Sequence, residues 1–191
     1  MAELGANGLS FRPTAGFSTV GLKTLGDEPL KLTSGRWYYE VTIGDGPLKC
    51  PQFGWCDERF KGGRNSGVGD DTFSWGIDGH RVKKWHGSSD AWGQEWKAGD
   101  VLGCMADLDA KTLSFSLNGS TDAPMGLAFE VIEFQGGVLP ALTANACSAV
   151  CNFGEDPAEP LKFLPEGYSS IASPNEHSET RGRLVDFAGQ S

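Results

Sequence analysis

The sequence has little positive charge and no long hydrophobic run. Its 16 Lys and Arg residues are outnumbered by 25 Asp and Glu residues, which gives a formal net charge of −9. An acidic protein is a poor general binder of nucleic acid or of anionic membranes, because both depend on basic side chains. No apolar run approaches the ~20 residues that span a bilayer, and residues 1–10 lack the pattern of a secretory signal. We expect a cytoplasmic protein, with a nuclear location open, that binds neither nucleic acid nor membranes.

Helical periodicity and a disulfide framework are also missing. No stretch repeats apolar residues at the 3.6-residue period of an amphipathic helix. The five cysteines are an odd number without framework spacing. Cys56 and Cys104 lie in apolar runs, where a reduced cysteine acts as a small hydrophobic residue. We therefore expect free thiols.

The motifs of common enzymes are absent. The sequence contains no Gly-x-Ser-x-Gly nucleophile elbow, no P-loop and no Gly-x-Gly-x-x-Gly dinucleotide motif. The carboxylates of Asp107 and Asp109 form the only pair in a strand context that a glycosidase could use. These absences predict a protein without catalytic residues or cofactors.

Two clusters of potential metal ligands are present, and both lack the spacing of a metal site. The acidic residues near 70–80 do not form an Asp-x-Asp-x-Asp-Gly loop, and carboxylates on loops more often serve turns. Cys147 and Cys151 have no second Cys or His pair to complete a zinc site. No metal is expected.

Alternating apolar residues and turn dipeptides predict an all-β protein. Two apolar runs, residues 101–108 and 113–117, flank a polar connection, and Asn118 with Gly119 marks the next turn. In the second run Leu113, Phe115 and Leu117 fall on one face, which is the two-residue period of a half-buried strand. This stretch predicts a hairpin inside a β-sheet.

Further strands are predicted where aromatic and β-branched residues lie between Gly, Pro and Asp turns. They cover residues 36–43, 52–56, 73–77, 81–85, 127–129, 138–143 and 149–154. Short strands at regular spacing predict one β-sandwich domain, which we place at residues 1–171 including strands near the N-terminus. Residues 172–191 carry little apolar content and are expected to form a flexible tail or linker.

The order of the motifs resembles the SPRY domain of the B30.2/SPRY family, and the resemblance covers about residues 5–170. The matching blocks are SGRWYYEV at 34–41, QFGWC at 52–56, GVGDD at 67–71, SWGIDG at 74–79, the run 96–119 that ends in FSLNG, LPAL at 139–142 and CNFG at 151–154. The sequence looks closest to the SPRY domains of large RING-type and HECT-type ubiquitin ligases and of ryanodine receptors. The resemblance implies a bent, antiparallel two-sheet β-sandwich, a concanavalin-like jelly roll. It further implies loops that bind a short segment of a partner protein without catalysis.

The loop at 58–65 is the main candidate for that binding. Arg59, Lys61 and Arg64 surround Phe60, so arginines that can pair with carboxylates flank an apolar anchor. Asn65 adds a polar group at the end of this stretch. The arrangement suits a partner segment with carboxylates beside an apolar residue. The alternative is that residues 58–65 form an ordinary solvated loop without a binding role.

Five further residues are predicted to contribute to the binding surface. Asp70 and Asp71 are expected to order the end of the loop, and His86 with Trp92 flanks a Gly- and Ser-containing loop. Asn145 follows the LPAL strand, where SPRY domains that clamp peptides often present a large aromatic residue. No aromatic residue occurs at this place here, so residues 58–71 become the stronger candidates for binding.

Two functions remain open from the sequence. The first is a monomeric protein-interaction module for substrate recruitment or scaffolding, and the second is a lectin-like sandwich that binds carbohydrate. Aromatic residues with Asn and Asp on loops suit either one.

Overall fold

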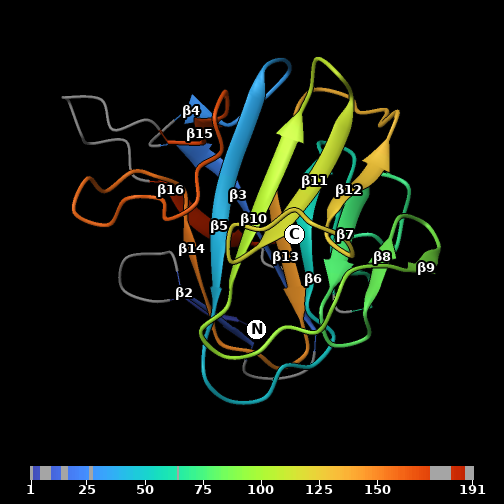
Figure 1. Ribbon diagram of the computed structural model, residues 1–191. Coiled ribbons are helices and arrows are strands. Elements are labelled where there is room, and N and C mark those ends of the chain that lie inside the picture. The colour runs from blue at the N-terminus through green and yellow to red at the C-terminus, as the bar shows by residue number, and fades with distance from the viewer. Residues whose placement is uncertain are drawn as a thin grey trace.

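The protein is a two-sheet β-sandwich (Figure 1). The structure, a computed structural model, describes residues 2–4, 10–13, 17–25, 28–63, 65–172 and 182–187. No α-helix occurs in these residues, and all strand pairs except β5 with β15 run antiparallel. The predicted all-β sandwich is therefore confirmed.

The first sheet has the strand order β1-β2-β14-β5-β10-β11-β12, with β15 paired to β5. Its strands are β1 (Ala2–Leu4), β2 (Ser10–Pro13), β5 (Arg36–Ile43), β10 (Val101–Asp107), β11 (Thr112–Leu117), β12 (Gly126–Glu130), β14 (Ala149–Asn152) and β15 (Ser169–Ser170). Strand β12 forms one edge of this sheet.

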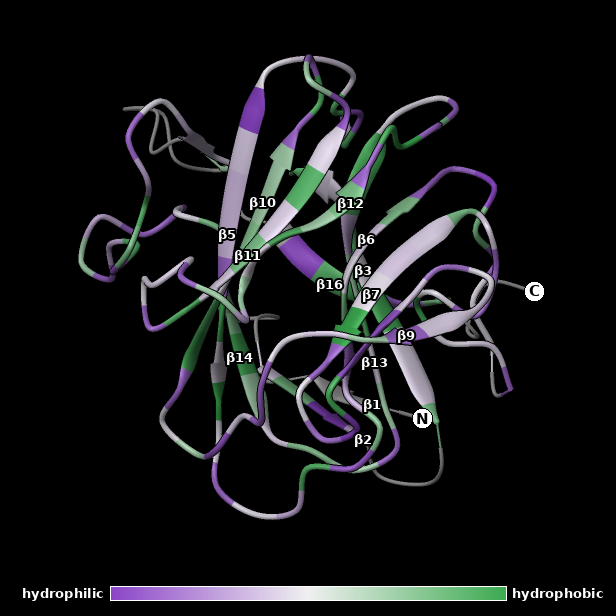
Figure 2. Cartoon of the chain, turned by 45° about the vertical axis from the view of Figure 1, so that its right-hand side comes forward, coloured by the Kyte–Doolittle hydropathy of each residue, from purple (hydrophilic) through white to green (hydrophobic). Residues whose placement is uncertain are grey.

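The second sheet has the order β16-β3-β13-β6-β7-β8-β9, with β4 paired to β3. Its strands are β3 (Ser18–Leu25), β4 (Glu28–Pro29), β6 (Gln52–Asp57), β7 (Ser74–Asp78), β8 (Lys83–Trp85), β9 (Ser89–Ala91), β13 (Val138–Ala144) and β16 (Gly182–Asp186). Strand β9 is an edge, and hydrophilic residues gather in the loops that join the strands (Figure 2).

The hairpin of β10 and β11 has the predicted register and faces. Leu102 pairs with Leu117 and Asp107 with Thr112, and β10 also pairs with β5, so the hairpin lies inside the sheet. The apolar residues of β11 point inward, and Phe115 is 0 % exposed. The turn at Asn118 and Gly119 has positive φ angles of 51° and 83°, which Asn and Gly adopt more readily than other residues.

Aromatic residues fill the space between the sheets. Tyr39 of β5 packs edge-on against Trp55 of β6, with ring centroids 5.0 Å apart, and tilted against Phe153 at 5.5 Å. The Tyr39 hydroxyl donates to the Gly54 carbonyl oxygen at 2.5 Å, so this buried polar group is paired across the sandwich. Burial raises the pKa of the Tyr39 hydroxyl, which keeps it protonated as this donor.

A second apolar cluster covers the outer face of the β6 sheet. Val68 and Phe60 of the loop after β6 pack on Cys56 and Ala141, and Phe187 completes the cluster. The rings of Phe60 and Phe187 lie 5.1 Å apart in an edge-to-face contact. The loop between β6 and β7 is therefore anchored by its own apolar residues.

Part of the predicted tail belongs to the sandwich. Within residues 172–191, which the sequence placed in a flexible tail, β16 pairs with β3 from Asp186 opposite Val20 to Gly182 opposite Leu25. Leu184 is buried in the main core, and the Lys23 ammonium lies 4.1 Å from the centroid of the Phe187 ring. The flexible-tail prediction is wrong for residues 182–187, because pairing with β3 and the burial of Leu184 and Phe187 hold this short strand.

The outer face of the β5 sheet is also covered. Glu40, a buried carboxylate on β5, accepts hydrogen bonds from the Tyr38 hydroxyl at 3.0 Å and from the backbone N–H groups of Lys162 and Phe163 at 3.0 and 2.6 Å. Three donors compensate the burial of this charge. The segment before β15 is thereby fixed across the sheet.

Replacing Phe115 with alanine should destabilise the domain by about 3–5 kcal/mol, because the change removes buried apolar surface and leaves a cavity. For a protein of this size we expect the Tm to fall by roughly 6–20 °C. Leu127→Ala is the control, since Leu127 lies on the neighbouring strand with 49 % of its surface exposed. A thermal shift for Phe115→Ala no larger than the control's would contradict the packing described here.

Replacing Phe187 with alanine should open the second cluster. Burial raises the pKa of the Cys56 thiol well above its usual range, so Cys56 should react slowly with Ellman's reagent in the native protein. In Phe187→Ala we expect one additional thiol to react at an appreciable rate, beyond the half-buried Cys50. Phe163→Ala, at a partly exposed aromatic residue outside this cluster, should leave the thiol kinetics unchanged.

Candidate binding surface

The first candidate residue, Arg59, is held by an ion pair inside the protein. Its guanidinium Nε donates to Asp57 Oδ2 at 2.9 Å, its Nη2 contacts the same carboxylate, and its centre lies 4.5 Å from the Phe73 ring centroid. The Asp57 side chain is fully buried, whereas about a third of the Arg59 side chain is exposed. The hydrogen bond to Asp57 raises the pKa of Arg59. Arg59 therefore balances a buried charge, and only its outer surface can meet a partner.

Phe60 is not the exposed anchor that the sequence predicted. It is only 3 % exposed and lies in the second apolar cluster, so the expectation of an exposed aromatic residue on this loop is wrong. A signal for this burial exists in β6, where the outward-facing positions carry Gly54 and Cys56. Small and apolar residues on both faces of a strand indicate that both faces are covered.

Arg64 lies outside the described residues, and Asn65 is exposed on the loop. The loop continues to Asp70 and Asp71, which order its end as predicted. Asp70 accepts hydrogen bonds from Gln52 Nε2 at 2.8 Å and from the Gly67 N–H at 2.7 Å. Asp71 accepts from the Phe73 N–H at 3.0 Å and from the Ser74 hydroxyl at 2.7 Å.

The predicted residues divide between the two ends of β6. Asp70 is bonded to Gln52, the first residue of β6. Thr143 of β13 lies opposite Gln52, and Asn145 comes two residues later, just after the end of β13. The Asn145 N–H donates to the Lys49 carbonyl oxygen at 3.0 Å. Arg59 lies two residues beyond Asp57, which ends β6 roughly 17 Å from Gln52 along a six-residue strand. Asp70 and Asn145 can therefore belong to one surface, whereas Arg59 lies near the other end of β6, against the Phe73 ring.

His86 and Trp92 lie where the two sheets approach each other at their edges. The His86 ring stacks on Trp75 with centroids 5.1 Å apart and an interplanar angle of 13°, and its Nδ1 lies 2.9 Å from the Ser74 carbonyl oxygen. Trp92 Nε1 donates to the Leu127 carbonyl oxygen of β12 at 3.3 Å. Trp92 therefore links the sheets, and His86 faces the space beside it.

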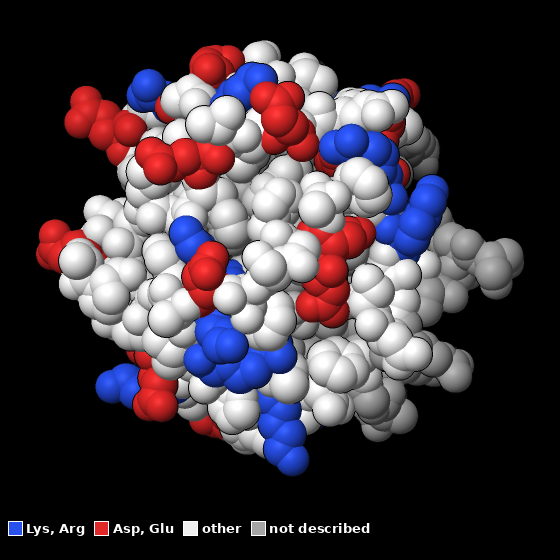
Figure 3. Space-filling view, turned by 90° about the vertical axis from the view of Figure 1, so that its right-hand side faces the viewer, with Lys and Arg blue, Asp and Glu red and all other residues white. Residues whose placement is uncertain are grey.

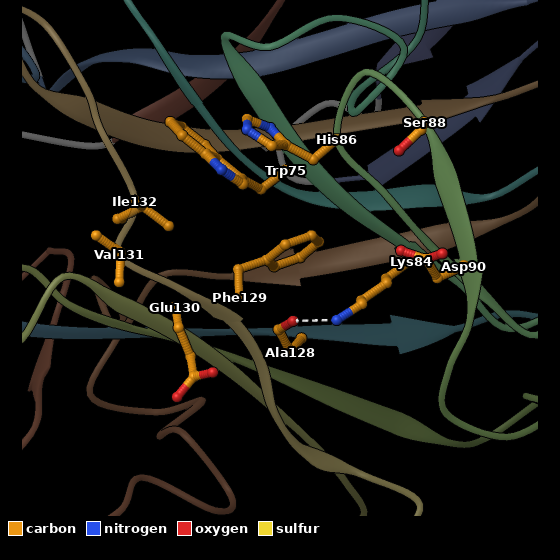
Figure 4. Close-up of a pocket in the computed structure, with 10 residues that line it drawn as sticks. All are labelled: Trp75, Lys84, His86, Ser88, Asp90, Ala128, Phe129, Glu130, Val131 and Ile132. Carbon is orange, nitrogen blue, oxygen red and sulfur yellow. Dashed lines mark hydrogen bonds between the residues drawn. The ribbon is translucent and has the colours of Figure 1, made fainter.

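That space is a hollow of about 370 Å³ between β8, β9 and β12 (Figure 4). Its lining residues are Trp75, Lys84, His86, Ser88, Asp90, Ala128, Phe129, Glu130, Val131 and Ile132. Lys84 Nζ donates to the Ala128 carbonyl oxygen at 2.8 Å, across the opening between the sheets. On this side of the molecule, basic and acidic side chains surround an uncharged area (Figure 3).

Sequence reasoning found only His86 of this lining as a binding residue. It placed Trp75 in the core, which its 1 % exposure bears out, although the ring also forms a wall of the hollow. The available signal was the two-residue period of an extended chain, which places Lys84 of β8 and His86, the residue after β8, on one side. Phe129 lies on β12 and Ile132 in the turn after it. No local sequence pattern indicates that these residues lie beside β8.

The hollow is connected to the end of the loop after β6. The Gly87 N–H donates to the Gly69 carbonyl oxygen at 2.9 Å, and the Gly69 N–H donates to the Ser74 hydroxyl at 2.8 Å. An extended segment of a partner protein that lay across Asp70 and Asp71 would therefore reach His86. We call the surface formed by Asn65, Asp70, Asp71, Asn145 and the hollow the loop face.

The described residues hold no group of three or more His, Cys, Asp or Glu side chains that could bind a metal ion. In the same part of the chain, no helix is long and apolar enough to cross a membrane. Burial raises the pKa of the Cys147 thiol to about 12 and also raises those of Cys104 and Cys151. These buried thiols stay protonated near neutral pH, which disfavours their use as nucleophiles.

Comparison with known proteins agrees with this architecture. The SPRY domain family matches residues 36–156, which is more than half of the chain, so the chain belongs to the SPRY domain family. SPRY domains are interaction modules, generally without catalytic activity. The chain is similar to the E3 ubiquitin-protein ligase RKP of Arabidopsis thaliana, with 34% identity over 141 residues. That match covers 72% of this chain and 10% of the relative, so the chain spans about a tenth of the relative's length.

Proposed function

We propose that this SPRY domain is a non-catalytic module that binds a short segment of a partner protein through the loop face. The observation that carries the proposal is the continuous surface from Asp70 to His86, which is fixed by hydrogen bonds of the domain itself. The similarity to a ubiquitin ligase supports a role in recruiting a substrate. Scaffolding within a larger assembly would use the same surface.

The loop face is held in place before any partner arrives. Asp70 fixes the loop through Gln52 and Gly67, and the Val68 N–H donates to Thr143 Oγ1 at 3.0 Å. Little ordering of the domain is then required on binding, and the entropic cost falls mainly on the partner segment. We expect an affinity on the order of micromolar, which corresponds to about −8 kcal/mol.

We expect the binding to depend only modestly on salt. The protein is acidic overall, and Arg59 and Arg81 are both paired with buried carboxylates of the domain. Any attraction to a partner is consequently local and is screened beyond about 10 Å at ~0.1 M salt. Apolar and hydrogen-bonding contacts are expected to supply most of the affinity.

The test begins with capture of binding proteins on the immobilised domain and their identification by mass spectrometry. Peptides that tile each captured protein are then titrated into the domain by calorimetry. Asp70→Ala should weaken binding of the active peptide at least tenfold, because it frees the loop end from Gln52. Glu95→Ala, at an exposed residue away from the loop face, is the matched control and should leave the affinity unchanged.

Binding of no peptide from any captured protein would contradict the proposal. A glycan array probed with the same protein tests the alternative, lectin-like function. Affinity for an oligosaccharide, lost in Asp70→Ala, with no affinity for peptides would establish the lectin-like function instead.

A further inference from the structure

The hollow beside His86 is an unfilled part of the loop face, and its chemistry defines what can enter it. Trp75, Phe129 and Ile132 form apolar walls, as Figure 4 shows, and Val131 stands at the rim with 74 % of its surface exposed. The hollow therefore combines these apolar walls with the polar side chains of Lys84, His86 and Ser88. A volume of about 370 Å³ accommodates one large side chain.

His86 lines this hollow and carries an unused hydrogen-bonding atom. The Ser74 carbonyl oxygen can only accept a hydrogen bond, so the Nδ1 that contacts it at 2.9 Å carries the proton. In the neutral imidazole this leaves Nε2 as an acceptor. Within the described part of the chain, Nε2 has no hydrogen-bond partner. A group that hydrogen-bonds to Nε2 of the neutral ring must therefore donate.

The charges around the hollow favour an uncharged occupant. The Lys84 ammonium lies inside, held by the Ala128 carbonyl oxygen, and it would repel a Lys or Arg side chain. Asp90 and Glu130, both exposed at the mouth, would repel a carboxylate. Within the described residues none of these three groups forms an ion pair.

We propose that the hollow binds a tyrosine side chain of the partner segment, with its hydroxyl donating to His86 Nε2. The phenol supplies the apolar ring that the walls of Trp75, Phe129 and Ile132 require. Its oxygen can also accept from the Lys84 ammonium, which has N–H groups beyond the one bonded to Ala128. An indole N–H can only donate, and a serine or threonine side chain leaves the apolar walls unfilled. This inference rests on the proposed function and identifies the residue that the surface selects.

The test uses three displayed heptapeptide libraries selected on the folded domain. One has tyrosine fixed at its centre, one has phenylalanine there, and one is fully random. We expect at least tenfold stronger enrichment of the tyrosine library than of the phenylalanine library. Synthetic peptides from the enriched pool, each made with Tyr and with Phe, should differ at least tenfold in Kd by calorimetry. The Tyr-to-Phe change is made in the peptide, so this comparison does not depend on the folding of any variant.

Two protein variants test whether the tyrosine hydroxyl of the peptide contacts His86. His86→Phe keeps an aromatic ring on Trp75 but removes the acceptor, so the preference for Tyr over Phe should disappear. His80→Phe is the matched control at an exposed histidine outside the hollow, and there the preference should persist. A thermal melt establishes that both variants are folded. Such a cycle isolates the contact between the two groups.

The outcomes separate the inference from the proposed function. Enrichment of random peptides without a tyrosine preference, or a preference that survives His86→Phe, would overturn the tyrosine site and leave peptide binding intact. Failure of all three libraries to enrich would contradict both.

Discussion

The arrangement of the loop face depends on close contact between a loop backbone and a glycine of the sheet. Gly76 of β7 has no side chain, and a Cβ built there would lie 2.6 Å from the Val68 carbonyl oxygen. Such a distance is shorter than real Cβ atoms tolerate, so the loop can lie this low on the sheet only because residue 76 is glycine. The same loop is held by Val68 packing on Cys56 and by the Val68 N–H bonded to Thr143.

This contact fixes the positions of the groups that a partner would meet. With the loop seated on the sheet, Gly69 accepts from Gly87 and donates to Ser74, whose carbonyl oxygen in turn orients the His86 ring. The chain of hydrogen bonds thus runs from the loop after β6 to the hollow at the sheet edges. The loop face is thus held by contacts that continue into the packing of the sheet, although it consists largely of loops.

Local patterns in the sequence were sufficient for the sandwich and its central hairpin. Phe115 lies in the core because the two-residue period of β11 is a property of neighbouring residues, and neighbouring residues are what the sequence displays directly. Phe60 packs against Ala141 and Phe187, which are far away in the chain, and periodicity carries no information about such contacts. For the same reason the sequence did not predict β16. A short strand between polar residues becomes recognisable only once the strand with which it pairs, here β3, is known.

The candidate site was predictable only in part. Asp70 and Asp71 order their loop through contacts within a few residues and with the adjacent β6, so turn chemistry indicated their role. The hollow combines His86 of one sheet with Phe129 of the other, and only the folded sandwich brings these residues together. Arg59 carried a convincing local signal, but its charge is balanced by the buried carboxylate of Asp57.

The seating of the loop on Gly76 is tested most directly by amide hydrogen exchange in a Gly76→Ala variant. The added methyl group should lift the loop, so the Val68 and Gly69 amides should exchange at least tenfold faster, while the amides of β10 keep their protection. Gly63→Ala is the matched control, because a Cβ at that position meets no atom within 4 Å. Unchanged protection of the Val68 amide in a folded Gly76→Ala protein would contradict the account.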